Sequence, residues 1–127
     1  MEQVIAADIY LIATPIFRAS FSASLKNLLD LVPVEGLMGK PCGLIRMGAT
    51  DHHYLAIDTQ LRPVLAWFGA YLVPGAVYLK SSHFQDGRLV DDAAIAGLES
   101  ITEAVIAAQQ AISERSGMMG PKPLAAG

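Results

Sequence analysis

Three things are scarce in this sequence of 127 residues: cysteine, an excess of basic charge, and long uninterrupted apolar segments. Cys42 is the single cysteine, so an intrachain disulfide or a metal site made of cysteines alone is excluded. Lysine and arginine number 9 against 12 aspartates and glutamates, and they form no basic stripe that could neutralise a nucleic-acid backbone. No apolar run reaches the ~18 residues that span a bilayer, and Glu2 stands where a secretion signal needs positive charge. We therefore expect a cytoplasmic protein with no nucleic-acid and no membrane partner.

What the sequence does contain is enough apolar material for one buried core. Its residues are 53% apolar and only 17% charged, and the length fits one domain. Residues 116–127 combine glycine, proline and small side chains, which cannot form a periodic packed face. We expect a domain over residues 1–115 and a flexible tail over 116–127, or a tail that packs on a partner subunit.

Three short apolar runs predict buried strands of a parallel sheet. They cover residues 9–13, 42–47 and 77–80, and turn-forming residues bound them. The first run is continuous and stops at Thr14, as expected of a strand that is buried on both faces. Arg46 is the exception in the second run, because a charge in a covered strand needs a partner or an exit to water.

Amphipathic helices alternate with these strands. Apolar residues at helical spacing cover 25–32 after a candidate N-cap at Ser22, and a second helix over 54–68 should bend at Pro63. Its marked face is Leu55, Asp58, Leu61, Leu65 and Phe68. A long last helix begins after Asp91 or Asp92, and its expected buried stripe is Ile95, Leu98, Ile101, Val105, Ala108 and Ile112. The alternation predicts an α/β fold with right-handed crossovers.

Two loops follow the carboxyl ends of the first two strands, where open parallel sheets bind their ligands. The segment 14–22 offers an aromatic ring, a guanidinium and several hydroxyls, and the segment 48–50 lets a ligand come close to the backbone. Such groups suit a flat, partly anionic heterocycle. Turn formation and helix capping explain the same residues equally well when spacing alone is considered.

Several of these stretches, in order and at the same spacing, resemble the NADPH-dependent FMN reductases of the flavodoxin-like superfamily. The resemblance is closest to reductases that supply two-component sulfonate monooxygenases. It is carried by residues 7–17, which read Ala-Asp-Ile-Tyr-Leu-Ile-Ala-Thr-Pro-Ile-Phe, and by 19–30, 39–41, 47–50 and 61–65.

The resemblance implies a flavodoxin-like three-layer fold with a parallel sheet of order 2-1-3-4-5. The three strands of this chain would be the third, fourth and fifth. It also implies that the flavin ring of FMN lies against two loops, whose residues here are Pro15, Ile16, Phe17, Arg18 and Ser20, and Gly48, Ala49 and Thr50. NADPH or NADH would be the reductant, and the assembly would be a homodimer or homotetramer with a monooxygenase as a possible partner.

Two departures from the family pattern affect this expectation. The family's first strand and Ser-rich phosphate-binding loop lie upstream of the matched region, so we expect an incomplete fold of about three strands without the usual phosphate anchor. The edge of the strand 9–13 would then need cover from a longer natural protein, from a second chain, or from an exchanged edge in a dimer. In addition, residues 46–50 read Arg-Met-Gly-Ala-Thr where many members have a small or apolar residue followed by Gly-Gly-Ser.

The expected reaction is transfer of hydride from a nicotinamide to the flavin, which needs positioning and shielding from the protein and no acid–base pair. This agrees with the lack of a triad or paired carboxylates, and we assign no catalytic side chain. Arg18 could instead contact a nucleotide phosphate or be solvated. Asp51, His52, His53 and His83 suggest a metal site, but surface or capping roles are favoured. The competing hypothesis is a flavin-free interaction subunit or inactive fragment that dimerises through its exposed strand.

Overall fold

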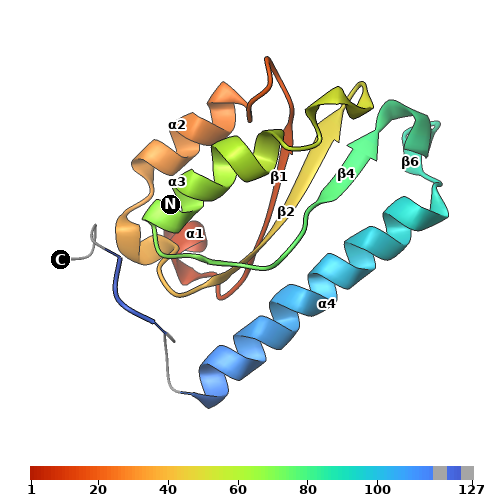
Figure 1. Ribbon diagram of the computed structural model, residues 1–127. Coiled ribbons are helices and arrows are strands. Elements are labelled where there is room, and N and C mark those ends of the chain that lie inside the picture. The colour runs from red at the N-terminus through yellow and green to blue at the C-terminus, as the bar shows by residue number, and fades with distance from the viewer. Residues whose placement is uncertain (116–119, 124–127) are drawn as a thin grey trace.

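The computed structural model describes residues 1–115 and 120–123, so part of the predicted tail lies outside the described residues. Helices and parallel strands alternate along the chain (Figure 1). In chain order the elements are α1 (Glu2–Ala6), β1 (Tyr10–Pro15), α2 (Ala23–Leu31), η1 (Val34–Gly36), β2 (Pro41–Gly48), η2 (Asp51–His53), η3 (Ile57–Leu61), α3 (Arg62–Trp67), β3 (Tyr71–Leu72), β4 (Val77–Lys80), η4 (Ser81–His83), β5 (Phe84–Gln85), β6 (Arg88–Leu89) and α4 (Asp92–Glu114). The predicted α/β class is confirmed.

The sheet is parallel and has β2 at its centre. On one side β1 pairs with β2 from Tyr10↔Cys42 to Pro15↔Met47. On the other side β4 pairs with the end of β2, from Ile45↔Val77 to Gly48↔Lys80, and the short β3 pairs with its beginning. The order β1-β2-β4 is the one expected for the third, fourth and fifth strands of a flavodoxin-like sheet. The sequence analysis did not predict β3, the two-residue strand that precedes the break in this edge.

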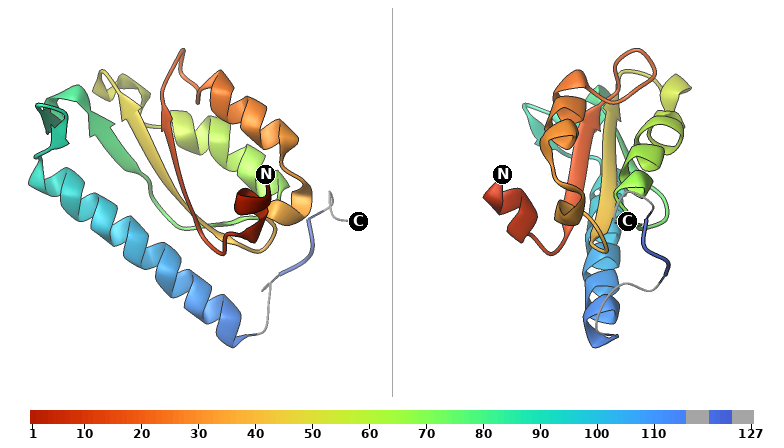
Figure 2. Two further views of the ribbon diagram at one scale, coloured as in Figure 1. Left: turned by 180° about the vertical axis from the view of Figure 1, so that it is seen from behind. Right: turned by 90° about the vertical axis from the view of Figure 1, so that its left-hand side faces the viewer.

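Helices cover both faces of the sheet and bury two apolar clusters. Leu44 of β2 packs in the first cluster with α2, η3 and α3, where Leu29, Leu61 and Leu65 are buried. Ile45, the next residue of β2, lies against the second cluster, which contains Val77 of β4, Ile101 and Val105 of α4, and Val73 between β3 and β4. Figure 2 shows the same arrangement, with α4 on the opposite side of the sheet from α2 and α3. The alternation of side chains along β2 therefore joins the three layers.

The first strand differs from its prediction in two respects. It runs to Pro15 instead of ending at Ala13, and its side chains alternate in burial although we expected cover on both faces. Leu11, on the face that carries α4, is 45% exposed. The reason is that α4 packs on β2 and β4, so among the described residues this face of β1 keeps little cover. The strand is an edge that pairs only with β2 within the described chain, as the sequence analysis expected.

The helix predicted over 54–68 is two segments of different type. Ile57–Leu61 forms a π-helical turn and Arg62–Trp67 continues as α-helix, with Pro63 in its first turn, where a missing N–H costs nothing. The π-helical turn changes the phase of the buried face. Leu55, predicted on that face, is 50% exposed, whereas Ile57 is fully buried.

The predicted helix caps are confirmed at both other long helices. The Ser22 hydroxyl accepts a hydrogen bond from the Leu25 N–H at 3.2 Å, and α2 ends before Pro33. The Asp91 carboxylate accepts from the Ala94 N–H at 2.8 Å, which decides between the two candidate caps of α4. Along α4, Ile101, Val105 and Ile112 of the predicted stripe are buried, and Ile95, Leu98 and Ala108 are partly buried.

Candidate flavin-ring site

The two loops predicted to form a site leave the same edge of the sheet side by side. Pro15 and Met47 form the last register pair between β1 and β2. One step further, the Ile16 N–H donates to the Met47 carbonyl at 2.8 Å, so the two chains stay joined as they leave the sheet. This contact brings the segment from Pro15 to Ser20 next to the segment from Gly48 to Thr50.

The first loop is a tight turn whose tip projects an aromatic ring. The N–H groups of Phe17 and Ser20 donate to each other's carbonyls at 2.9 and 3.0 Å. Arg18 and Ala19, which lie between these two residues, have φ values of 51° and 62°. Residues other than glycine or asparagine seldom adopt this left-handed backbone conformation. Phe17 is 61% exposed. A backbone held in this way at a sheet edge is typical of sites where loop shape has a function.

The base of this loop is fixed to the helix that follows. Thr14 is 3% exposed, and its hydroxyl accepts a hydrogen bond from the Ser22 N–H at 3.0 Å. The same Ser22 caps α2. The loop is therefore anchored at both ends, by β1 and by the first turn of α2.

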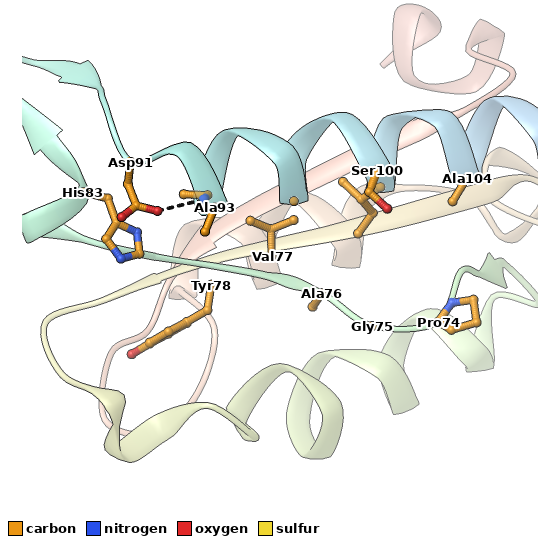
Figure 3. A pocket seen from close by; sticks show the side chains of 13 residues that line it. Pro74, Gly75, Ala76, Val77, Tyr78, His83, Asp91, Ala93, Ser100 and Ala104 are labelled. Carbon is orange, nitrogen blue, oxygen red and sulfur yellow. Dashed lines mark hydrogen bonds between the residues drawn. The ribbon is translucent and has the colours of Figure 1, made fainter.

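The second loop passes close under a tyrosine of β4. Tyr78 donates its hydroxyl proton to the Thr50 carbonyl. A β-carbon at Gly48 would collide with the same hydroxyl oxygen and would lie 2.9 Å from Cζ of the ring. Figure 3 shows Tyr78 on the face of the sheet away from α4. Glycine at this position is thus required for the approach of the loop to the edge strand.

Four backbone N–H groups in the two loops are available to a ligand. Within residues 1–115 and 120–123, those of Arg18, Ala19, Ala49 and Thr50 donate to no acceptor. All four residues are exposed. The pyrimidine end of a flavin carries carbonyl oxygens and a ring nitrogen, and backbone donors beside an aromatic side chain fit such a group. The residues present therefore fit a flavin ring.

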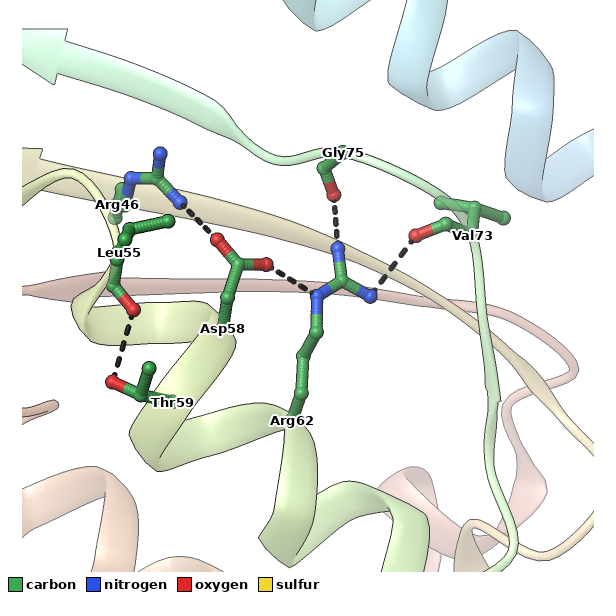
Figure 4. A network of polar contacts seen from close by, with 7 residues as sticks. All are labelled: Arg46, Leu55, Asp58, Thr59, Arg62, Val73 and Gly75. Carbon is green, nitrogen blue, oxygen red and sulfur yellow. Dashed lines mark hydrogen bonds and ion pairs between the residues drawn. The ribbon is translucent and has the colours of Figure 1, made fainter.

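Behind the second loop lies a charged network that the sequence analysis did not predict (Figure 4). Arg46 is 8% exposed, and its Nη1 lies 3.4 Å from a carboxylate oxygen of Asp58. Asp58 is therefore the partner that a charged side chain inside β2 needs. Arg62 Nε contacts the other oxygen at 2.6 Å, and its two terminal nitrogens donate to the carbonyls of Val73 and Gly75. Arg62 thus satisfies backbone groups at the break between β3 and β4. The spacing of Asp58 and Arg62, four residues apart on a helix, was a signal that could have been used.

Three of the four residues that suggested a metal site make other contacts. Asp51 pairs with Lys80 at 3.1 Å. His52 Nδ1 lies 3.0 Å from the Thr50 hydroxyl, and His83 Nδ1 accepts the Lys80 N–H at 3.3 Å. Within the part of the chain that the structure describes, no three histidine, cysteine or acidic side chains gather as metal ligands would.

Cys42 lies away from the candidate site. It lies in the first half of β2, paired with Tyr10, whereas the two loops follow the ends of the strands. The thiol is fully buried, and burial raises its pKa to about 12. At neutral pH the group is a protonated apolar side chain and not a nucleophile.

None of the described helices is long and apolar enough to cross a membrane.

Comparisons with known proteins agree with this arrangement. The model of the family described as NADPH-dependent FMN reductase matches residues 1–84. An NAD(P)H-dependent FAD/FMN reductase of Geobacillus thermodenitrificans (strain NG80-2) is 44% identical over 92 residues, which are 72% of this chain and 50% of the relative. The NADH-dependent FMN reductase SfnF of Pseudomonas putida is 35% identical over 107 residues, 84% of this chain and 58% of the relative.

Solved structures share the fold. The apo form of the NADH:FMN oxidoreductase EMOB superposes with a TM-score of 0.68 at 31% identity, over 87% of this chain and 58% of that one. The chain spans about half the length of the curated relatives that it matches. Because the family model covers more than half of the chain, and because the sheet order is the one that the family implies, the chain belongs to the NADPH-dependent FMN reductase family.

Proposed function

We propose that this chain forms the flavin-ring part of an FMN reductase in which a reduced nicotinamide passes hydride to FMN. The observation that carries the proposal is the Ile16 N–H to Met47 carbonyl contact of 2.8 Å, which joins two loops rich in available backbone donors at one sheet edge. The family supports the cofactors FMN and NADPH or NADH. Since the chain spans about half of its relatives, the proposal concerns the ring-binding part of the site.

Each loop has a separate task in this proposal. Phe17, with Pro15 and Ile16 beside it, covers the apolar part of the ring, and Arg18 and Ser20 contribute polar contacts at its margin. Gly48, Ala49 and Thr50 offer backbone to the pyrimidine end. The flavin itself supplies the redox chemistry, so the protein's part is to hold the ring, keep water from one face and leave the other open to the nicotinamide.

Flavin binding and turnover by the full chain test the proposal together. FMN fluorescence should be quenched when the protein is added, and NADPH or NADH oxidation should then depend on FMN. Phe17→Ala should weaken FMN binding about three- to tenfold, because an aromatic contact adds ~0.5–1.5 kcal/mol beyond burial. Ile106→Ala is the matched control, since Ile106 is also an exposed apolar side chain, at 43%, but lies on α4. Lack of quenching and lack of turnover would instead indicate a flavin-free interaction subunit.

We also propose that the chain assembles as a homodimer or homotetramer. Trp67 of α3 is 57% exposed and lines a cavity of about 490 Å³ between α2 and α3, which also has Leu29, Val64 and Phe68 in its wall. A large exposed aromatic side chain beside an apolar cavity is typical of subunit contacts. Trp67→Glu should lower the mass measured by sedimentation equilibrium, and Ile106→Glu on α4 should not; a monomeric parent chain would refute the assembly.

We also propose a partner and a location for this chain. A monooxygenase that consumes reduced FMN is the partner that the proposal favours, and a cytoplasmic location suits a reductase that draws on nicotinamide and keeps an unpaired thiol at Cys42. Binding of such a monooxygenase to the purified chain can be measured directly. Lack of binding would instead indicate a reductase that releases free reduced FMN into solution.

A further inference from the structure

The Gly48–Thr50 loop is attached to the edge strand β4 by two side chains. Tyr78 donates to the Thr50 carbonyl, and Lys80 forms an ion pair with Asp51 at 3.1 Å. The second attachment is weak, since the Asp51 side chain is 76% exposed and exposed ion pairs contribute little. Tyr78 is therefore the contact that decides the position of this loop relative to the sheet.

The ring of Tyr78 is itself supported by a side chain of the neighbouring strand β2. Tyr78 and Arg46 are register partners on adjacent parallel strands, so their side chains leave the same face of the sheet. The Arg46 guanidinium lies 5.2 Å from the centre of the tyrosine ring, within the range of a cation–π contact. Asp58 in turn fixes the guanidinium by its ion pair.

The buried charge of Arg46 depends on these two contacts. Its side chain is 9% exposed, and its Nε is buried without a hydrogen-bond partner among the described residues. A buried cation with an unsatisfied donor is costly, so its contacts with Asp58 and the Tyr78 ring must compensate.

From these contacts we propose that Tyr78, supported on the Arg46 guanidinium, is a positioning residue that sets the Gly48–Thr50 loop for contact with the flavin ring. It acts through the loop backbone and not by touching the reacting atoms. The proposal rests on the proposed function for the identity of the ligand, but the effect of Tyr78 on the loop is independent of any ligand.

The decisive variant is Tyr78→Phe in the full chain, which keeps the ring on Arg46 and removes the hydroxyl. Tyr54→Phe is the matched control, because Tyr54 is 56% exposed and its hydroxyl bonds to no described residue. Backbone amide order parameters, measured without flavin by nuclear magnetic resonance relaxation, should fall in residues 48–51 of Tyr78→Phe and stay unchanged in α2, because the loop loses its main attachment to β4. FMN binding, measured by fluorescence quenching, should weaken about three- to tenfold, the effect of losing one hydrogen bond. Tyr54→Phe should change neither quantity.

The two measurements separate the two claims. Loop order parameters that are equal in Tyr78→Phe and in the parent overturn the positioning role, whatever the flavin does. Lower loop order parameters in Tyr78→Phe, in a protein whose parent chain fails to quench FMN, support the positioning role and refute the proposed function. Lower order parameters over the whole sheet indicate loss of folding support and overturn the specific role, and Arg46→Met then shows whether the ring support alone is responsible.

Discussion

Replacement of Asp58 by asparagine should destabilise the protein far more than the same replacement at Asp30. Both carboxylates accept a 2.6 Å contact from a cation four residues away on a helix, Arg62 for Asp58 and Lys26 for Asp30. The difference is burial, because Asp58 also neutralises Arg46, whose side chain is only 9% exposed, whereas the Lys26–Asp30 pair is open to water.

The magnitude follows from the Arg46–Asp58 distance. Two unit charges at 3.4 Å attract each other by about 5 kcal/mol at an effective dielectric constant of about 20. Asp58 is 35% exposed, so water replaces part of that attraction when the charge is lost. We expect Asp58→Asn to lower the free energy of unfolding by about 2–3 kcal/mol, below the range for fully buried pairs. Asp30→Asn should cost no more than about 0.5 kcal/mol.

Urea unfolding followed by circular dichroism measures both values. A second background isolates the buried charge: in Arg46→Met, which removes the cation, Asp58→Asn should cost at least about 1 kcal/mol less than in the parent. Equal costs for Asp58→Asn and Asp30→Asn, or an equal cost of Asp58→Asn in both backgrounds, would refute the assigned role of this network.

Three further predictions concern the loop, the core and a helix end. Gly48→Ala should destabilise the chain by about 1–3 kcal/mol in urea unfolding, since its β-carbon collides with the Tyr78 hydroxyl, and addition of Tyr78→Phe should recover part of the loss; a loss unaffected by Tyr78→Phe would contradict the contact. The folded pKa of Cys42, about 12, exceeds the unfolded value of ~8.5, so its contribution to stability is complete below that value and decreases as pH rises toward 12; between pH 9 and 11 the Cys42→Ala variant should therefore lose less stability than the parent, and equal losses would contradict this. Asp91→Ala should lower the thermal midpoint by an amount equivalent to about 1 kcal/mol and Asp92→Ala by clearly less, because only Asp91 caps α4; equal effects would reject the assignment.

Local sequence signals predicted most of the fold. The strand at Val77–Lys80 has the expected bounds, and the caps at Ser22 and Asp91 follow from short polar side chains that precede apolar periodicity. The π-helical turn at Ile57–Leu61 escaped prediction because templates with 3.6 residues per turn have no place for an extra residue. Exposure of Leu11 depends on where α4 crosses the sheet, which is a tertiary property.

The candidate site, too, could be predicted only in part from the sequence. The rule that parallel strands end at one edge was sufficient to place the Pro15 and Gly48 loops together. The left-handed conformation of Arg18 was not predictable, because neither it nor its neighbour is glycine or asparagine. Tyr78 was missed since its contact with Thr50 joins residues 28 positions apart, and no local pattern records such a pairing.

The proposed function depends on the two loops holding a flavin ring between them. Lumiflavin, which carries the ring and no phosphate, tests it most directly when it is titrated into isotope-labelled protein and amide shifts are followed by nuclear magnetic resonance. We expect saturable shifts in residues 16–20 and 48–51 together, with little change along α4. Shifts confined to one loop would contradict the proposal, and so would shifts centred on the cavity of about 560 Å³ that Val77 of β4 and Ile101 of α4 help to line.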